Sequence, residues 1–156
     1  MGSPNDAPVM QSAVDVLKEL GITVEMTVAS AHRSPERVMR LLGEAETRGV
    51  KVFIVGAGAA AHLGGVVAAH VSKPVIGVPI DSSALNGLDA LLSTVQMPPG
   101  VPVATVSIGK AGATNAGVLA AQILALGDNA IAQRVKKYKD GLAEKVEEAA
   151  RKLANA

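Results

Sequence analysis

The stretch Lys51-Val52-Phe53-Ile54-Val55-Gly56-Ala57-Gly58-Ala59-Ala60-Ala61-His62 decides the fold. Residues 51–55 form a short apolar run with β-branched and aromatic side chains, which predicts a strand that leads into the glycines. Small residues from Ala59 to Val71 predict a helix, and Pro74 to Pro79 indicates a second, buried strand. A strand, a helix and another strand in this order are typical of a parallel sheet.

The same alternation continues on both sides of this stretch. We expect helices over 8–20, 34–48, 85–95 and 111–126, and strands over 22–28 and 101–108. The sequence therefore predicts an α/β fold of three αβα layers around a doubly wound parallel sheet, flavodoxin-like or Rossmann-like. Residues 1–127 are expected to form one domain and residues 128–156 a C-terminal helical arm. Met1-Gly2-Ser3 resembles the turn that follows a strand, so the domain is expected to open without its first strand.

Composition excludes several classes of protein. The 156 residues include no cysteine, which excludes a disulfide scaffold and a thiolate nucleophile. A net charge of +1 and only two aromatic residues give no basis for binding nucleic acid. No apolar run approaches the roughly 20 residues that a membrane span needs. Asp6 and Pro8 interrupt the N-terminus before a signal sequence could form, so a soluble, cytoplasmic protein is expected.

The middle of the chain carries very little charge. From Val52 to Gly109 the formally charged residues are Lys73, Asp81 and Asp89 alone. A small domain would have difficulty exposing so neutral a surface to water, so we expect part of it to be buried between subunits.

The first candidate site is the segment Ala29-Ser30-Ala31-His32-Arg33-Ser34-Pro35, between a predicted strand and a predicted helix. Ligands of open α/β sheets bind at the carboxyl ends of strands. Arg33 offers a planar cation to phosphate oxygens, and Ser30 can donate a further hydrogen bond. His32 can give and take a proton near neutral pH. This loop predicts a site for a small phosphorylated substrate with His32 as the acid–base group.

The second candidate is the glycine segment Gly56-Ala57-Gly58 with His62 after it. It matches the dinucleotide pattern G-x-G-x-x-G/A, and Asp81, roughly 20 residues further on, could bind a ribose hydroxyl. A nicotinamide-dependent oxidoreductase is therefore one interpretation. The other is that the glycines let the backbone form the wall of a tight pocket for a small group, with His62 at its rim.

A third turn, Gly2-Ser3-Pro4-Asn5-Asp6, would place a hydroxyl and a carboxylate in the same crevice, or cap a helix. The three histidines are not at the i, i+4 spacing of metal ligands and lack a paired carboxylate, so a metal site is not expected.

Together these loops resemble the N5-carboxyaminoimidazole ribonucleotide mutase family of purine biosynthesis, in its bacterial-type branch. The resemblance also rests on separated motifs later in the chain, which occur in the family's order: Pro74-Val75-Ile76-Gly77-Val78-Pro79, Ala84-Leu85-Asn86-Gly87-Leu88-Asp89, Val95-Gln96-Met97-Pro98 and Ile108-Gly109-Lys110-Ala111-Gly112-Ala113. Three positions depart from the family pattern: Asn5 replaces serine, Ala59 replaces glycine and Gly64 replaces proline.

The resemblance implies an enzyme without cofactor or metal that moves a carboxyl group through trapped carbon dioxide. It assigns proton transfer to His32. Contacts with the substrate would come from Ser3, Asp6, Ser30, Arg33, Ala57, Gly58, His62 and Leu63, with the phosphate at Ser3, Ser30 and Arg33 and the ribose at Asp6. It also implies a homo-octamer with active sites at subunit contacts. A carboxylase that takes free carbon dioxide, the oxidoreductase and a non-catalytic nucleotide-binding protein remain as alternatives.

Overall fold

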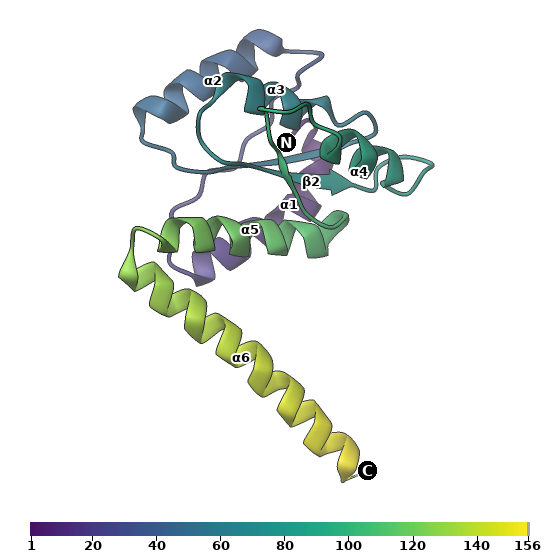
Figure 1. The fold of residues 1–156 in the computed structure, drawn as a ribbon. Coiled ribbons are helices and arrows are strands. Elements are labelled where there is room, and N and C mark those ends of the chain that lie inside the picture. The colour runs from purple at the N-terminus through teal and green to yellow at the C-terminus, as the bar shows by residue number, and fades with distance from the viewer. Residues whose placement is uncertain (156) are drawn as a thin grey trace.

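The computed structural model describes residues 1–155, and Figure 1 shows their arrangement. The strands are β1 (Phe53–Gly58), β2 (Val75–Ile80) and β3 (Ala104–Thr105). The helices are a 3₁₀ turn at Pro4–Asp6, α1 (Ala7–Glu19), α2 (Pro35–Thr47), α3 (His62–His70), α4 (Leu88–Val95), α5 (Gly109–Ala125) and α6 (Asn129–Ala154). None of the helices in residues 1–155 is both long and apolar enough to cross a membrane.

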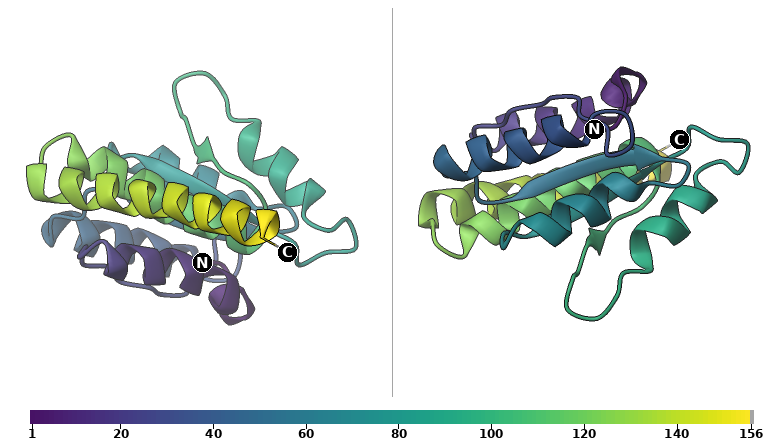
Figure 2. Two further views of the ribbon diagram at one scale, coloured as in Figure 1. Left: turned by 90° about the horizontal axis from the view of Figure 1, so that it is seen from below. Right: turned by 90° about the horizontal axis from the view of Figure 1, so that it is seen from above.

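The three strands form one parallel sheet in the order β1-β2-β3, with Phe53 opposite Val75 and Ile76 opposite Ala104. Helices α1 and α5 cover one face, and α2, α3 and α4 cover the other (Figures 1 and 2). Strand β2 is buried along its whole length, as expected for a strand with helices on both sides. The predicted three-layer α/β fold is confirmed.

Small residues bring the helices close to the sheet and to each other. Helix α5 buries a stripe of alanine and glycine against α1, and a Cβ at Gly117 would overlap Val16 and lie 3.0 Å from the carbonyl oxygen of Ala13. These close helix contacts are made in a chain with no tryptophan and a single phenylalanine.

Two predicted strands differ from the structure. Residues 22–28 are extended but form no strand, because no neighbouring strand lies beside them within the described chain. The strand expected over 101–108 is reduced to Ala104–Thr105, since only these residues pair with β2.

The glycine segment also differs from the prediction. Gly56 and Gly58 lie inside β1, which begins at Phe53 rather than Lys51. Helix α3 starts only at His62, because Ala59 and Ala61 adopt left-handed backbone angles, with φ of 51° and 46°. Such angles interrupt a right-handed helix.

Helix α6 packs only its first turns on the domain. Asp128 caps it by accepting hydrogen bonds from the backbone N–H groups of Ala130 and Ile131. Val135 is buried against α1 and α5, and Arg134 Nε donates to the carbonyl of Leu20 at 2.6 Å. The rest of the helix extends away from the domain (Figure 1). The division into a domain of residues 1–127 and an arm of residues 128–156 stays a prediction, and Ala156 lies outside the described residues.

The close approach of α1 and α5 gives a test of the packing. We expect Gly117→Ala to destabilise the protein by about 1–3 kcal/mol, because the added methyl group must push the two helices apart. Gly43→Ala in α2 is the matched control: nothing lies within 4 Å of the added methyl, and alanine favours the helix. Chemical denaturation measures both variants, and a Gly117→Ala protein as stable as Gly43→Ala would contradict the packing argument.

Candidate active site

Three loops meet at the carboxyl edge of the sheet and line a cavity of about 510 Å³. They are the turn after Met1, the segment 30–33 and the segment that leaves β1 at Gly58. All nine residues predicted for the site line this cavity: Ser3, Asp6, Ser30, His32, Arg33, Ala57, Gly58, His62 and Leu63. The structure brings these residues together, while the role of each one stays a prediction.

Ser3 and Asp6 form a reciprocal cap on the first turn of the chain. Asp6 Oδ2 accepts a hydrogen bond from the Ser3 backbone N–H at 3.0 Å, and Ser3 Oγ accepts one from the Asn5 N–H at 3.2 Å. The capping that the sequence left as an alternative is thus present, and it also orients the hydroxyl and the carboxyl group in the cavity wall.

The side chain of Asp6 is only 5% exposed. Burial raises the pKa of its carboxyl group above 3.8, while the hydrogen bond from Ser3, the Met1 ammonium and the Arg33 guanidinium act in the opposite direction. The charged carboxylate of Asp6 therefore lowers the stability of the native state. Such a loss of stability is common for groups that serve a ligand rather than the fold.

Arg33 links two of the loops. Its Nη2 donates to the carbonyl oxygen of Gly2 at 3.0 Å, and its backbone N–H donates to Ser30 Oγ at 3.2 Å. Ser34 occupies the N-cap position of α2, but its hydroxyl does not cap the helix and instead bonds the backbone of Ser30, accepting from the N–H and donating to the carbonyl. The segment 30–34 is thereby a closed turn that presents Arg33 and Ser30 to one cavity.

Two histidines from different segments touch at the cavity, His32 in the loop before α2 and His62 at the first residue of α3. His32 Nε2 lies 2.6 Å from His62 Nδ1, and the rings meet edge to face with centroids 4.8 Å apart. One proton must lie between these nitrogens, since two N–H groups would repel each other and two lone pairs could not bond. Each ring keeps its second nitrogen for another partner, so this pair can pass a proton to a ligand.

Glycine is needed where β1 ends. A Cβ at Gly58 would overlap Ser82 Oγ, and one at Gly56 would overlap Met10 Sδ. These contacts explain both glycines by close packing. Asp81 lies beside Gly87 and Gly109 and is not among the residues that line the cavity, so the dinucleotide interpretation gains no support.

The sequence reasoning missed one polar residue of the cavity, Ser82. The signal was its position two residues after β2, since loops that follow neighbouring parallel strands meet at the same edge. Within residues 1–155 no three histidine, aspartate or glutamate side chains gather as a metal site.

The fold and the site define a class of protein: an α/β domain with a compact ligand cavity at the carboxyl edge of a parallel sheet, carrying a cation, a buried carboxyl group and a histidine pair. The family model described as AIR carboxylase matches residues 1–145. The chain belongs to this family.

Its relatives are similar over nearly the whole chain. A Thermotoga maritima protein named N5-carboxyaminoimidazole ribonucleotide mutase is 53% identical over 98% of this chain and 88% of its own length. A Bacillus subtilis protein of the same name is 52% identical over 98% of this chain and 94% of its own. The crystal structure of Treponema denticola PurE superimposes with a TM-score of 0.89 at 34% identity, covering 98% of this chain and 94% of that one. The resemblance predicted from the sequence is confirmed.

The burial of Asp6 gives a test with a defined pH dependence. Because its pKa is raised on folding, the carboxylate destabilises the native state at pH values above that pKa, and this cost disappears as the group takes up a proton. We expect Asp6→Asn, which is neutral at every pH, to be more stable than the parent at pH 7. The advantage should shrink on acidification and vanish below about pH 3.8.

Denaturant unfolding at a series of pH values measures this difference. Asp15→Asn, an exposed residue of α1, is the control and should leave stability nearly unchanged. An Asp6→Asn protein that is less stable than the parent at pH 7 would show that the hydrogen bond to Ser3 and the nearby cations outweigh desolvation.

Proposed function

We propose that this protein is an N5-carboxyaminoimidazole ribonucleotide mutase that converts its substrate to 4-carboxy-5-aminoimidazole ribonucleotide in purine biosynthesis. The observation that carries the proposal is the convergence of His32, His62, Arg33 and Asp6 on one cavity in a chain with mutase-named relatives.

The reaction moves a carboxyl group from nitrogen to carbon. The carbamate C–N bond breaks, carbon dioxide leaves and the nitrogen takes up a proton. The adjacent ring carbon then attacks the carbon dioxide, and loss of the proton from that carbon restores the aromatic ring. Protons and atoms balance, because one proton is given and one is taken back.

His32 suits both proton steps. It lies at the cavity with one ring nitrogen against His62, and the other nitrogen is available to the substrate. As an acid it protonates the nitrogen that loses carbon dioxide, and as a base it then removes the proton from the ring carbon. The contact with His62 supports this exchange in two ways. It fixes the orientation of the His32 ring, and it allows His62 to give or take a proton when His32 changes its protonation state.

The remaining residues of the cavity bind the substrate and enclose the carbon dioxide. Arg33 and the hydroxyls of Ser3 and Ser30 suit the phosphate, which a guanidinium binds through paired hydrogen bonds. Asp6 suits the ribose hydroxyls. Ala57, Gly58 and Leu63 bring backbone and apolar surface beside the histidines, which would keep neutral carbon dioxide close to the ring until it reacts.

His32 is tested by substitution. We expect His32→Asn to lower kcat by about 10²–10⁴-fold, because asparagine can still hydrogen-bond but cannot carry the proton. Ribonucleotide binding should persist. His70→Asn is the control, since His70 is exposed at the end of α3 and bonds only the carbonyl of Val66 among the described residues.

The same assay separates the alternatives. Conversion of the N5-carboxylated substrate without added bicarbonate supports the mutase, whereas activity that needs aminoimidazole ribonucleotide and carbon dioxide supports the carboxylase. High activity in His32→Asn would refute the role of His32. A negligible rate in both the parent and the variant would favour a non-catalytic nucleotide-binding protein.

We also propose that the enzyme is a cytoplasmic homo-octamer that binds no nucleic acid. The homo-octamer is supported by the family resemblance and by an exposed apolar surface on α4 and the loop before it. Leu85, Leu88, Leu92 and Val95 are 61%, 52%, 51% and 50% exposed. Such a surface on a small domain usually marks a protein contact. It lies in the charge-poor stretch between Val52 and Gly109.

Light scattering tests this surface. We expect Leu92→Asp to reduce the assembly to smaller species, because a charge in an apolar contact must be desolvated. Leu126→Asp changes a residue that is 90% exposed and lies away from α4, so it should leave the mass unchanged. A Leu92→Asp protein with the parent's mass would place the subunit contact elsewhere.

A further inference from the structure

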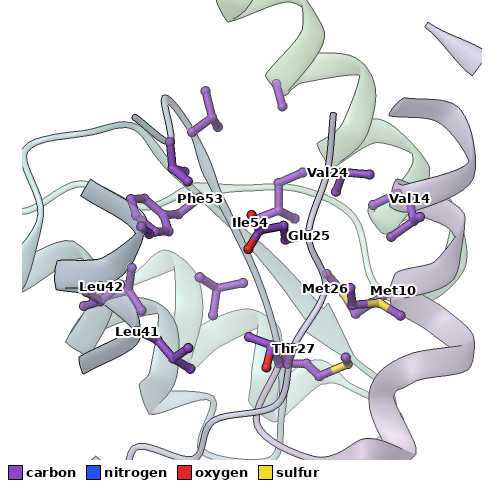
Figure 3. A pocket seen from close by; sticks show the side chains of 18 of the residues that line it. Met10, Val14, Val24, Glu25, Met26, Thr27, Leu41, Leu42, Phe53 and Ile54 are labelled. Atoms are coloured by element: carbon purple, nitrogen blue, oxygen red, sulfur yellow. Dashed lines mark hydrogen bonds between the residues drawn. The ribbon is translucent and has the colours of Figure 1, made fainter. Parts of the chain in front are cut away.

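Two cavities of the domain differ in their chemistry. The cavity beside β1 measures about 530 Å³ and is lined mostly by aliphatic side chains, among them Val14 and Ile54 (Figure 3). The candidate active-site cavity, of about 510 Å³, instead contains three serine hydroxyls, those of Ser3, Ser30 and Ser82. The first two belong to the proposed phosphate contacts. Ser82 has no part in that scheme, although its hydroxyl lies in the same cavity.

The three hydroxyls also differ in their hydrogen bonds. Ser3 Oγ accepts from the N–H of Asn5 at 3.2 Å, and Ser30 Oγ accepts from the N–H of Arg33 at 3.2 Å. Each of these hydroxyls thereby stabilises its own turn. Ser82 is exposed, and its Oγ forms no hydrogen bond with another group of residues 1–155. The Ser82 hydroxyl can therefore donate to, or accept from, a ligand in the cavity.

The position of the Ser82 side chain is tied to Gly58 at the end of β1. A Cβ built on Gly58 would overlap Ser82 Oγ and lie 3.0 Å from Ser82 Cβ. The hydroxyl thus occupies the space that a side chain at position 58 would fill, against the backbone of β1. A side chain placed in this way loses less conformational freedom when a ligand binds, which favours a contact at this point of the cavity wall.

Ser82 lies at the opposite end of the cavity from the proposed phosphate loop. The segments that form this edge are joined in a row by backbone hydrogen bonds: Ala29 N–H donates to the carbonyl of Met1, and Gly2 N–H donates to the carbonyl of Gly56 in β1. Strand β1 then pairs with β2, which ends two residues before Ser82. The phosphate loop follows Ala29 at one end of this row, and Ser82 follows β2 at the other.

This order determines which part of the ligand can reach Ser82. On the basis of the proposed function, the phosphate lies at Arg33 and the ribose at Asp6, so the aminoimidazole ring extends past His32 and His62 toward the ends of β1 and β2. The strongest hydrogen-bond acceptor at that end of the ligand is its carboxylate, because a charged acceptor binds a donor more tightly than a neutral one.

We propose that Ser82 Oγ donates a hydrogen bond to the carboxylate that is transferred. Ser82 is then a specificity-determining residue, which favours ribonucleotides that carry this carboxyl group over aminoimidazole ribonucleotide.

A neutral donor suits a carboxylate that must be released. When the C–N bond of the carbamate breaks, its electron pair stays on the nitrogen, which takes the proton from His32, and the carboxylate becomes uncharged carbon dioxide. A cation beside the carboxylate would stabilise the charged form and lose that interaction in the transition state, which would raise the barrier. The arginine of the cavity, Arg33, instead bonds Gly2 and Ser30 on the phosphate side. Ser82 can orient the carboxylate with a weaker bond, which forms again after the ring carbon attacks.

Ligand binding tests this contact. Calorimetric titration compares 4-carboxy-5-aminoimidazole ribonucleotide with aminoimidazole ribonucleotide, which lacks the carboxyl group, on the parent protein and on Ser82→Ala. We expect Ser82→Ala to weaken binding of the carboxylated ligand by about 10–100-fold, the loss typical of a hydrogen bond to a charged group. Its affinity for aminoimidazole ribonucleotide should equal that of the parent, since this ligand offers no carboxylate to Ser82.

Ser83→Ala is the matched control. Ser83 Oγ accepts from the N–H of Leu85 at 3.2 Å, and Ser83 is not among the residues that line the cavity. The control therefore removes a hydroxyl from the same loop without removing a ligand contact, and both ligands should bind it as they bind the parent. A crystal of the parent with the carboxylated ribonucleotide should place a carboxylate oxygen about 2.5–3.0 Å from Ser82 Oγ.

Four results would overturn the proposal. Equal binding of the carboxylated ligand by the parent and Ser82→Ala would show that the contact is absent. An equal loss of affinity for both ligands would show that Ser82 shapes the cavity rather than recognising the carboxylate. The same loss in Ser83→Ala would attribute the effect to the loop as a whole. These three results leave the proposed function intact, whereas a parent that binds neither ribonucleotide would overturn the proposed function together with the contact.

Discussion

The site depends on the register of the backbone around Met1 and Gly2. Their hydrogen bonds to Thr27, Ala29 and Gly56 fix the first turn between the segment that leads to Ser30 and the strand that leads to Gly58. Arg33 reinforces the arrangement by bonding the carbonyl of Gly2. Because side chains near parallel strand ends inherit their positions from backbone register, a shift of one residue here would separate Asp6 from His32. The geometry of the cavity thus follows from a few backbone contacts made far from each other in sequence.

Close packing is the second requirement, and small residues provide it. Gly56, Gly58 and Gly117 each sit where a Cβ would overlap a neighbour, so the backbone itself forms the contact surface. At Gly58 the neighbour is Ser82, which lines the cavity, so packing and ligand site are set by the same atoms. A core with larger side chains would hold the helices apart and open the wall beside the histidines. The scarcity of aromatic residues is therefore consistent with a site built for a small group.

Much of this could be predicted from sequence because the signals are local. Periodicity and turn residues predicted α1, α2, β2 and α5 to within a few residues, and the positions after strands predicted His32 and Arg33 as neighbours of Asp6. The failures involve information from elsewhere in the chain. Residues 22–28 have the composition of a strand but lack a partner, and β3 pairs over two residues only. The left-handed angles of Ala59 and Ala61 could not be predicted, because the Cβ of alanine disfavours them. The contact of His32 with His62 joins a loop to the start of α3, and no local sequence pattern relates these two segments.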